Sequence, residues 1–176
     1  MSTGTSDGGM RPGSATWWVT KVRQTKRHLL ARVSPRERDA VAAWLSPAEL
    51  DVFDAMHVAD RRHGLDVVAA LRAAGERDPE VLVAGLIHDA GKGDTGIPPR
   101  ILYALGQAGF GGLLRIGRRL PGMTVALARL AAHAETSARM AEAAGCSPRT
   151  VELIRWQDAP RDPEAGERLR LADEAS

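Results

Sequence analysis

Apolar residues recur along this chain at steps of three and four, the spacing of one face of an α-helix. One such stripe runs over residues 59–70 and a second over residues 81–88. Strictly alternating stretches, which mark β-strands, are missing, and β-branched and aromatic residues are few beside the alanines. The pattern predicts an all-α domain. Its helices are expected at 17–31, 35–45, 47–56, 57–74, 79–90, 123–144, 148–157 and 163–174.

Helix starts are marked by a capping residue followed directly by proline. Ser and Asp side chains accept hydrogen bonds from free N–H groups of a first turn, and proline suits the first helical position. The pairs of Ser34 with Glu37 and of Ser46 with Glu49 also have the spacing of a capping box. Gly75 and Gly145 are expected to end helices. The five predicted N-caps are Ser34, Ser46, Asp78, Ser147 and Asp162.

Residues 91–122 are rich in glycine and proline and are expected to form loops with one or two short helices. This stretch is the candidate for a mobile lid. Within it, residues 110–120 place Arg115, Arg118 and Arg119 among leucines and isoleucine. That composition fits a helix lying on a membrane surface, but an ordinary amphipathic helix is the favoured interpretation.

The chain has 176 residues, of which 44% are hydrophobic and 26% charged, so a folded domain with its own core is expected. A single cysteine, Cys146, excludes a disulfide framework and favours a reducing cytoplasm. No apolar run is long enough to cross a bilayer. Residues 1–16 are expected to be a disordered leader without the pattern of a secretory signal, and residues 17–49 a basic helical extension.

The net charge of +2 is unevenly distributed. Residues 1–33 contain six basic side chains and one acidic side chain, Asp7. Such a segment can contact nucleic acid or an anionic membrane, here through residues 11–33, or it can be the solvated face of a helix. The rest of the chain, after residue 33, is by contrast not strongly basic.

Two histidines and two carboxylates stand out as candidate metal ligands. His63 and His88 lie on the predicted apolar faces, where a histidine is either a packed core residue or a ligand. Asp89 follows the most apolar segment of the chain, and a buried carboxylate is costly without a nearby cation. Asp173 lies among leucines near the C-terminus. A mixed set of imidazoles and carboxylates suits Mn²⁺, Fe²⁺, Co²⁺ or Zn²⁺ better than Ca²⁺.

The order of His63, then His88 and Asp89, then Asp173 resembles the H…HD…D signature of the HD-domain metal-dependent phosphohydrolases. Residues 86–92, Leu-Ile-His-Asp-Ala-Gly-Lys, are similar to the HDxGK form of that superfamily. The similarity covers about residues 50–176, and residues 59–63 and an Arg to Lys ratio of 21 to 3 resemble compact members from high-GC bacteria. The resemblance implies an HD-domain-like helical bundle that follows an N-terminal helical extension and holds a metal at its centre.

By this resemblance His63, His88, Asp89 and Asp173 would bind one divalent ion of Mn, Fe, Co, Zn or Mg. Asp89 would also accept the proton of the attacking water. Lys92, with Arg61 or Arg62, would offset negative charge on a phosphoryl group. Lys92 is placed for this between Gly91 and Gly93, which let the backbone approach a phosphate.

His133 stands where relatives with two metals have a further histidine. It would donate to the phosphate or leaving group, or it lies on a helix surface. Those relatives continue with a histidine pair, whereas this chain has Trp156 and Gln157, and it lacks a Gly-Tyr-Pro element. A second metal and cleavage of cyclic di-GMP are therefore disfavoured.

The function expected from the resemblance is hydrolysis of a small phosphomonoester or phosphodiester, such as a nucleotide, in the cytoplasm. The alternative is a non-catalytic HD-fold module that retains the metal site and serves regulation or partner binding. A third possibility is an adaptor that binds nucleic acid or a membrane surface through residues 11–33, and it predicts salt-sensitive binding.

Overall fold

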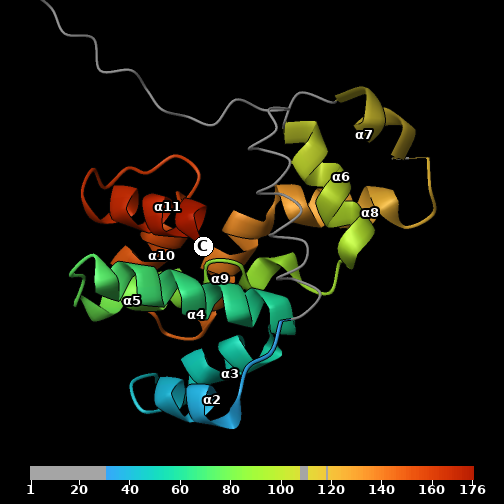
Figure 1. Ribbon diagram of the computed structural model, residues 1–176. Coiled ribbons are helices and arrows are strands. Elements are labelled where there is room, and N and C mark those ends of the chain that lie inside the picture. Colours follow the sequence, from blue (N-terminus) through green and yellow to red (C-terminus); the bar gives the residue numbers. More distant parts are fainter. Residues whose placement is uncertain (1–30, 108–110, 118) are drawn as a thin grey trace, which may run out of the picture.

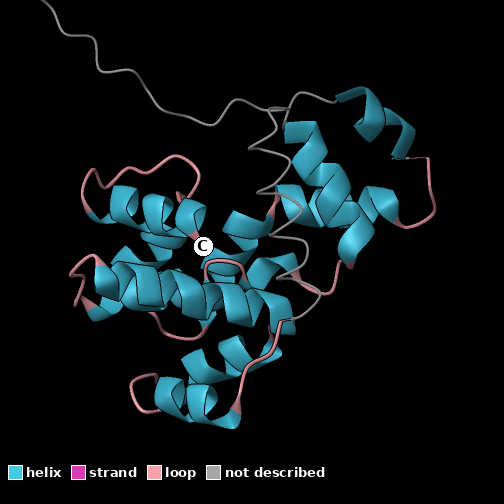
Figure 2. Cartoon of the chain, in the orientation of Figure 1, coloured by secondary structure: helices cyan, strands magenta, loops and turns pink. Residues whose placement is uncertain are grey.

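In the computed structural model, which describes residues 31–107, 111–117 and 119–176, every regular element is helical, as expected (Figure 2). None of the helices in these ranges is long and apolar enough to cross a membrane. Figure 1 shows the arrangement, with α4, α5, α9, α10 and α11 grouped together and α6, α7 and α8 on one side of that group. The elements are α2 (Pro35–Ala42), α3 (Pro47–Ala55), α4 (Val58–Ala73), α5 (Pro79–Ile87), the 3₁₀ turn η1 (Ala90–Lys92), α6 (Ile97–Gln107), α7 (Gly111–Gly117), α8 (Met123–Ala131), α9 (His133–Ala143), α10 (Pro148–Arg155) and α11 (Ala165–Ala175).

Four of the five predicted N-caps begin helices as expected, and both predicted capping boxes are formed. The fifth differs: α11 begins at Ala165 instead of residue 163. Even so, Asp162 Oδ1 accepts from the backbone N–H groups of Glu164 and Ala165 at 2.9 and 2.8 Å. Gly75 and Gly145 end their helices with φ of 93° and 80°, in the left-handed region that glycine favours. The four confirmed caps are Ser34, Ser46, Asp78 and Ser147.

Several predicted helices end elsewhere than expected, and the helices predicted over 35–45 and 148–157 end early, at Ala42 and Arg155. The single helix predicted over 123–144 is two helices, α8 and α9, separated at Ala132, whose φ and ψ are −103° and 8°. The break accompanies a hydrogen bond from His133 Nδ1 back to Leu130 O (2.7 Å), which no local sequence signal announces. The helix predicted over 79–90 ends at Ile87, and the chain continues into η1.

The glycine-rich stretch forms two α-helices, as expected, although α6, with 11 residues, is longer than the short helix predicted. The helix predicted over 17–31 and the leader at 1–16 lie outside the described residues, apart from residue 31. The predicted boundary between the N-terminal extension and the domain, at residue 49, falls inside α3. Val41 of α2 and Phe53 of α3 belong to the same buried cluster as α5, so both helices pack on the common core.

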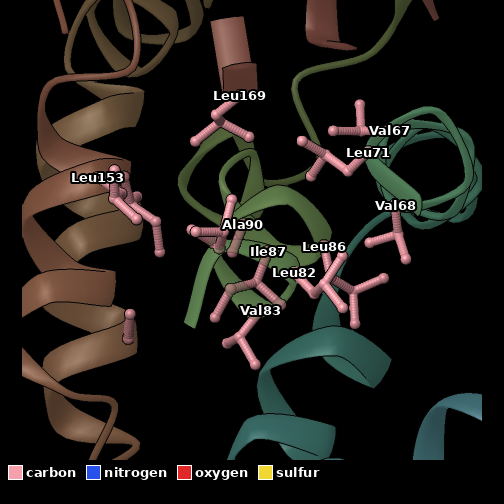
Figure 3. Packing of buried hydrophobic residues seen from close by; sticks show 14 of the residues in the cluster. Val67, Val68, Leu71, Leu82, Val83, Leu86, Ile87, Ala90, Leu153 and Leu169 are labelled. Atoms are coloured by element: carbon pink, nitrogen blue, oxygen red, sulfur yellow. The ribbon is translucent and has the colours of Figure 1, made fainter. Parts of the chain in front are cut away.

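The core centres on α5, which is buried along its length from Val81 to Ile87 (Figure 3). Two glycines bring α4 and α5 unusually close. A Cβ on Gly64 would lie 2.2 Å from Leu86 O, and one on Gly85 would lie 2.8 Å from Leu71 Cδ1. Since His63 precedes Gly64 along α4, this close approach places its ring beside that of His88, with the ring centroids 5.3 Å apart.

Candidate metal centre

Three separate segments bring the predicted metal ligands together. His63 comes from the middle of α4, His88 and Asp89 follow the last residue of α5, and Asp173 lies in the final turn of α11. The Nε2 atom of His63 lies 2.6 Å from Asp173 Oδ1, and that of His88 lies 3.4 Å from the same oxygen. One ligand atom from each of His63, His88 and Asp173 lies within 4.8 Å of the others, so this group could hold a metal ion.

His88 is oriented before any ligand arrives. It is 2% exposed, and its Nδ1 lies 2.9 Å from Gly85 O. A carbonyl oxygen only accepts, so Nδ1 is the donor and Nε2 faces Asp89 and Asp173. Histidines that bind metals are commonly fixed through the second ring nitrogen in this way.

Asp89, which is 2% exposed, lies at the centre of the site. Its Oδ1 is 3.5 Å from His88 Nε2 and 3.7 Å from His133 Nε2, while its Oδ2 is 3.9 Å from His63 Nε2. Lys92 Nζ lies 2.5 Å from Oδ2. The carboxylate therefore has one oxygen held by an ammonium group and one oxygen directed at two imidazoles.

The electrostatics of the site favour positive charge. Burial alone would lower the pKa of His88, but the carboxylates of Asp89 and Asp173 overcome this and raise it to about 9. Burial would raise the pKa of Asp89, yet His88, Lys92 and His63 hold it well below its usual value. For Asp173, hydrogen bonds from His63 and His88 likewise outweigh burial and lower the pKa. Protonated histidine supplies charge that a divalent cation would supply instead.

The donor set fits a borderline divalent metal. Donors about 2.1 Å from a tetrahedrally bound ion are roughly 3.4 Å apart. The separation of 3.4 Å between His88 Nε2 and Asp173 Oδ1 matches that spacing. The shorter 2.6 Å contact between His63 and Asp173 is a hydrogen bond, in which the ring proton occupies the place of a cation. Two imidazole nitrogens beside carboxylate oxygens suit Mn²⁺, Fe²⁺, Co²⁺ or Zn²⁺.

His133 lies in the site and is not a surface residue, since its side chain is only 12% exposed. Its Nδ1 donates to Leu130 O, so the other nitrogen, Nε2, accepts from the Gln157 side-chain amide at 2.9 Å. The pair fixes the ring in one tautomer beside Asp89. Gln157 is 8% exposed, and its Oε1 has no hydrogen-bond partner among the described residues.

Gly91 has a packing role that the motif alone does not reveal. Its N–H donates to Ser137 Oγ at 2.8 Å, and a Cβ at this position would lie 2.4 Å from His133 O and 2.7 Å from Ser137 N. Glycine therefore allows η1 to contact the first turn of α9. This contact holds Asp89 and His133 in their relative positions. It also means that the backbone of Gly91 faces α9, whereas the sequence suggested that it would face a phosphate.

The structure does not bring Arg62 to the metal group. Its guanidinium pairs with Glu37 Oε1 at 2.5 Å and Asp66 Oδ1 at 3.0 Å, so it joins α4 to α2. Neighbouring Arg61 has its nearest ion pair with Asp54, at 3.8 Å. Both arginines are used in packing the N-terminal helices, a role that depends on partners distant in the sequence.

A buried ion pair lies beside the site. Asp60, 4% exposed, receives two hydrogen bonds from Arg100, at 2.5 and 2.7 Å. Arg100 also donates to Gly93 O and Thr95 Oγ1, both at 3.1 Å. The pair fixes the loop that follows Lys92 against α4. Its partners are 40 residues apart, and no spacing in the sequence connects them.

No family model, curated protein or solved structure matches this chain. The resemblance to HD-domain phosphohydrolases therefore rests on the motif residues themselves. What the structure adds is an all-helical domain in which His63, His88 and Asp173 form a group that could hold a metal ion.

Proposed function

We propose that this protein is a metal-dependent phosphohydrolase that cleaves a small phosphomonoester or phosphodiester, such as a nucleotide. The observation that carries the proposal is the convergence of His63, His88 and Asp173, whose ligand atoms lie within 4.8 Å of one another. Asp89 lies within 3.9 Å of both imidazoles and would complete the ligand set. A divalent ion held there would supply Lewis acidity, which acidifies water and polarises a phosphoryl oxygen.

Asp89 would accept a hydrogen bond from the attacking water through one oxygen only. Lys92 holds Oδ2, whereas Oδ1 faces His88 and His133 at 3.5 and 3.7 Å. A carboxylate with one oxygen fixed by an ion pair keeps its orientation when the other oxygen accepts a hydrogen bond from water. Fixed orientation is valuable because a general base acts only within hydrogen-bond reach of its proton.

Lys92 is assigned to the phosphoryl group. Its side chain is 25% exposed, and its ammonium group has three N–H donors, of which Asp89 uses one. The remaining donors are available to phosphoryl oxygens, where charge grows as the bond to the leaving group breaks. This role replaces the one expected for Arg62, whose guanidinium is committed to Glu37 and Asp66.

His133 orients the site in its present state and does not donate from Nε2, because that atom accepts from Gln157. Donation to a leaving group would require a proton on Nε2 and movement of the Gln157 side chain away from that nitrogen. We therefore assign His133 to positioning of the site.

The test combines metal analysis of the purified protein with a screen of mononucleotides, cyclic nucleotides and an aryl phosphate. Bound metal, with turnover that is lost in Asp89→Ala, supports the proposal. Asp158→Ala, which removes an exposed carboxylate, is the matched control and should retain full turnover. Bound metal without turnover of any phosphate ester would instead favour the non-catalytic module, and absence of bound metal at saturating Mn²⁺ or Zn²⁺ would refute both.

A further inference from the structure

The region formed by α6, α7 and α8 has a surface unlike the rest of the molecule. No aspartate or glutamate occurs between Asp94 and Glu135, whereas five arginines do. Outside this stretch and outside residues 1–33, the chain has 13 basic and 21 acidic residues. Figure 1 shows α6, α7 and α8 together on one side of the molecule, so the acid-free stretch forms one end of a strongly polarised charge distribution.

The same region also exposes aliphatic side chains. Of the five large hydrophobic side chains that are exposed among the described residues, four belong to it. Ile116, Val125 and Leu120 are 65%, 60% and 56% exposed, and Ile101 is 43% exposed. Burial of such side chains against another surface is favourable in proportion to the apolar area removed from water. Four exposed apolar side chains within one group of contacting helices favour an interaction surface in this region.

Arginines lie between these apolar positions. Arg115 precedes Ile116 and Arg119 precedes Leu120, and Arg115, Arg119 and Arg129 are all exposed. None of these three forms an ion pair within the described part of the chain. Arg100 differs, because its guanidinium is bound to Asp60. The three exposed guanidinium groups are therefore available to an external anion.

We propose that the α6–α8 region docks the protein reversibly on anionic lipid bilayers. Ile116, Leu120 and Val125 would enter the interface between headgroups and acyl chains, and Arg115 and Arg119 would bind lipid phosphates. A second copy of this chain that docks through the same surface is a poor occupant, since two acid-free surfaces carry charge of the same sign. The basic segment at 1–33 is a poor occupant for the same reason.

An anionic bilayer fits better than nucleic acid. Isoleucine, leucine and valine cannot stack on bases as aromatic side chains do, and they gain little from contact with phosphates. A bilayer, in contrast, offers both a negative surface and an apolar layer beneath it. The proposal concerns attachment of the protein and does not depend on what the metal centre does.

The test is co-sedimentation of the full chain with vesicles. We expect binding to vesicles of equal parts phosphatidylcholine and phosphatidylglycerol, no binding to phosphatidylcholine alone, and release by salt. The double substitution Arg115→Ser with Arg119→Ser should lower the partition coefficient about 25-fold, at roughly fivefold for each arginine. Ile116→Asn with Leu120→Asn should lower it at least about tenfold through lost apolar burial.

Matched controls lie outside the region. Arg139→Ser removes an arginine that is 71% exposed on α9, and Leu171→Asn removes a leucine that is 51% exposed on α11; both should leave binding unchanged. Circular dichroism checks that every variant is folded. Absence of binding to the anionic vesicles would overturn the proposal. So would loss of binding in Lys26→Ser with Arg27→Ser but not in the α6–α8 variants, or binding of duplex DNA in place of vesicles.

Discussion

The two sides of the candidate metal centre differ in how their polar atoms are satisfied. On the side formed by α4, α5 and α11, the nitrogens of His63 and His88 converge on a single oxygen of Asp173, at 2.6 and 3.4 Å. On the side formed by η1, α9 and α10, Lys92 is bound to Asp89 and His133 to Gln157. Asp89 lies between the two sides.

This difference suggests that one side of the site binds the metal and the other side orients Asp89. The first side brings several ligand atoms together, and the negative charge of its carboxylate needs a nearby positive charge. Its residues should therefore decide whether a cation binds. The second side consists of side chains that already have partners, and its residues should decide the geometry around Asp89. Substitutions on the two sides are therefore expected to have different signatures: lost metal affinity on one, and altered stability or turnover on the other.

The largest effect is expected for Asp173→Asn. The change removes the oxygen that both imidazoles contact and should weaken Zn²⁺ or Mn²⁺ binding about 100-fold or more. Because the Asp173 side chain is 44% exposed, the fold should tolerate the amide. Isothermal titration calorimetry measures the loss. Asp158→Asn, at an exposed carboxylate, is the control and should bind metal normally, and equal metal affinity in both variants would contradict the role of Asp173.

The next largest effect concerns the pH dependence of metal binding. The raised pKa of His88, about 9, means that the metal-free site holds a proton there at neutral pH. A metal needs the neutral imidazole, so each bound ion must displace that proton. Metal affinity should rise about tenfold per pH unit between roughly pH 7 and 9 and then level off. Titrations across this range should release a proton on binding, and pH-independent affinity would refute the expectation.

Gly91→Ala tests the rigid side. Its Cβ would lie 2.4 Å from His133 O, and backbone atoms cannot move aside as flexible side chains can. We expect a loss of about 1–3 kcal/mol in the free energy of unfolding, measured by urea denaturation. Gly112→Ala is the matched control, because a Cβ there meets nothing within 4 Å. In helix α7 that change should stabilise slightly, and equal stability of the two variants would show that η1 and α9 are not tightly packed.

What the sequence predicted correctly depends on short-range chemistry. Ser34 and Ser46 cap helices through atoms three residues away, and the positive φ of Gly75 is likewise a local requirement. The convergence of His63, His88 and Asp173 was expected from resemblance to known motifs, and the structure brings them together. Periodicity alone could only place His63 and His88 on inward faces.

Most of what the sequence could not predict depends on distant partners. The break at Ala132 is an exception, because it lies in an alanine-rich stretch that favours uninterrupted helix and accompanies a bond between near neighbours, His133 and Leu130. The ion pair between Arg62 and Glu37 joins residues 25 positions apart, and the hydrogen bond between His133 and Gln157 joins residues 24 positions apart. Gln157 was notable in the sequence only as a departure from a histidine pair. Its contact with His133 depends on how the segment that follows α10 packs against the start of α9.

The smallest effect is expected for Gln157→Leu, which replaces the amide by an apolar group of similar volume. The change removes the donor to His133 Nε2 and also the unpartnered Oε1, so stability should change little. Metal affinity should stay at its wild-type value, whereas turnover should fall about tenfold because the ring is no longer fixed beside Asp89. Nitrogen NMR of His133 gives a readout independent of activity: the single Nδ1–H tautomer should give way to a mixture. Glu152→Gln, at an exposed site on α10, should alter neither property. An unchanged tautomer in Gln157→Leu would show that Leu130 alone holds the ring, and the second side of the centre would then be less rigid than its hydrogen bonds indicate.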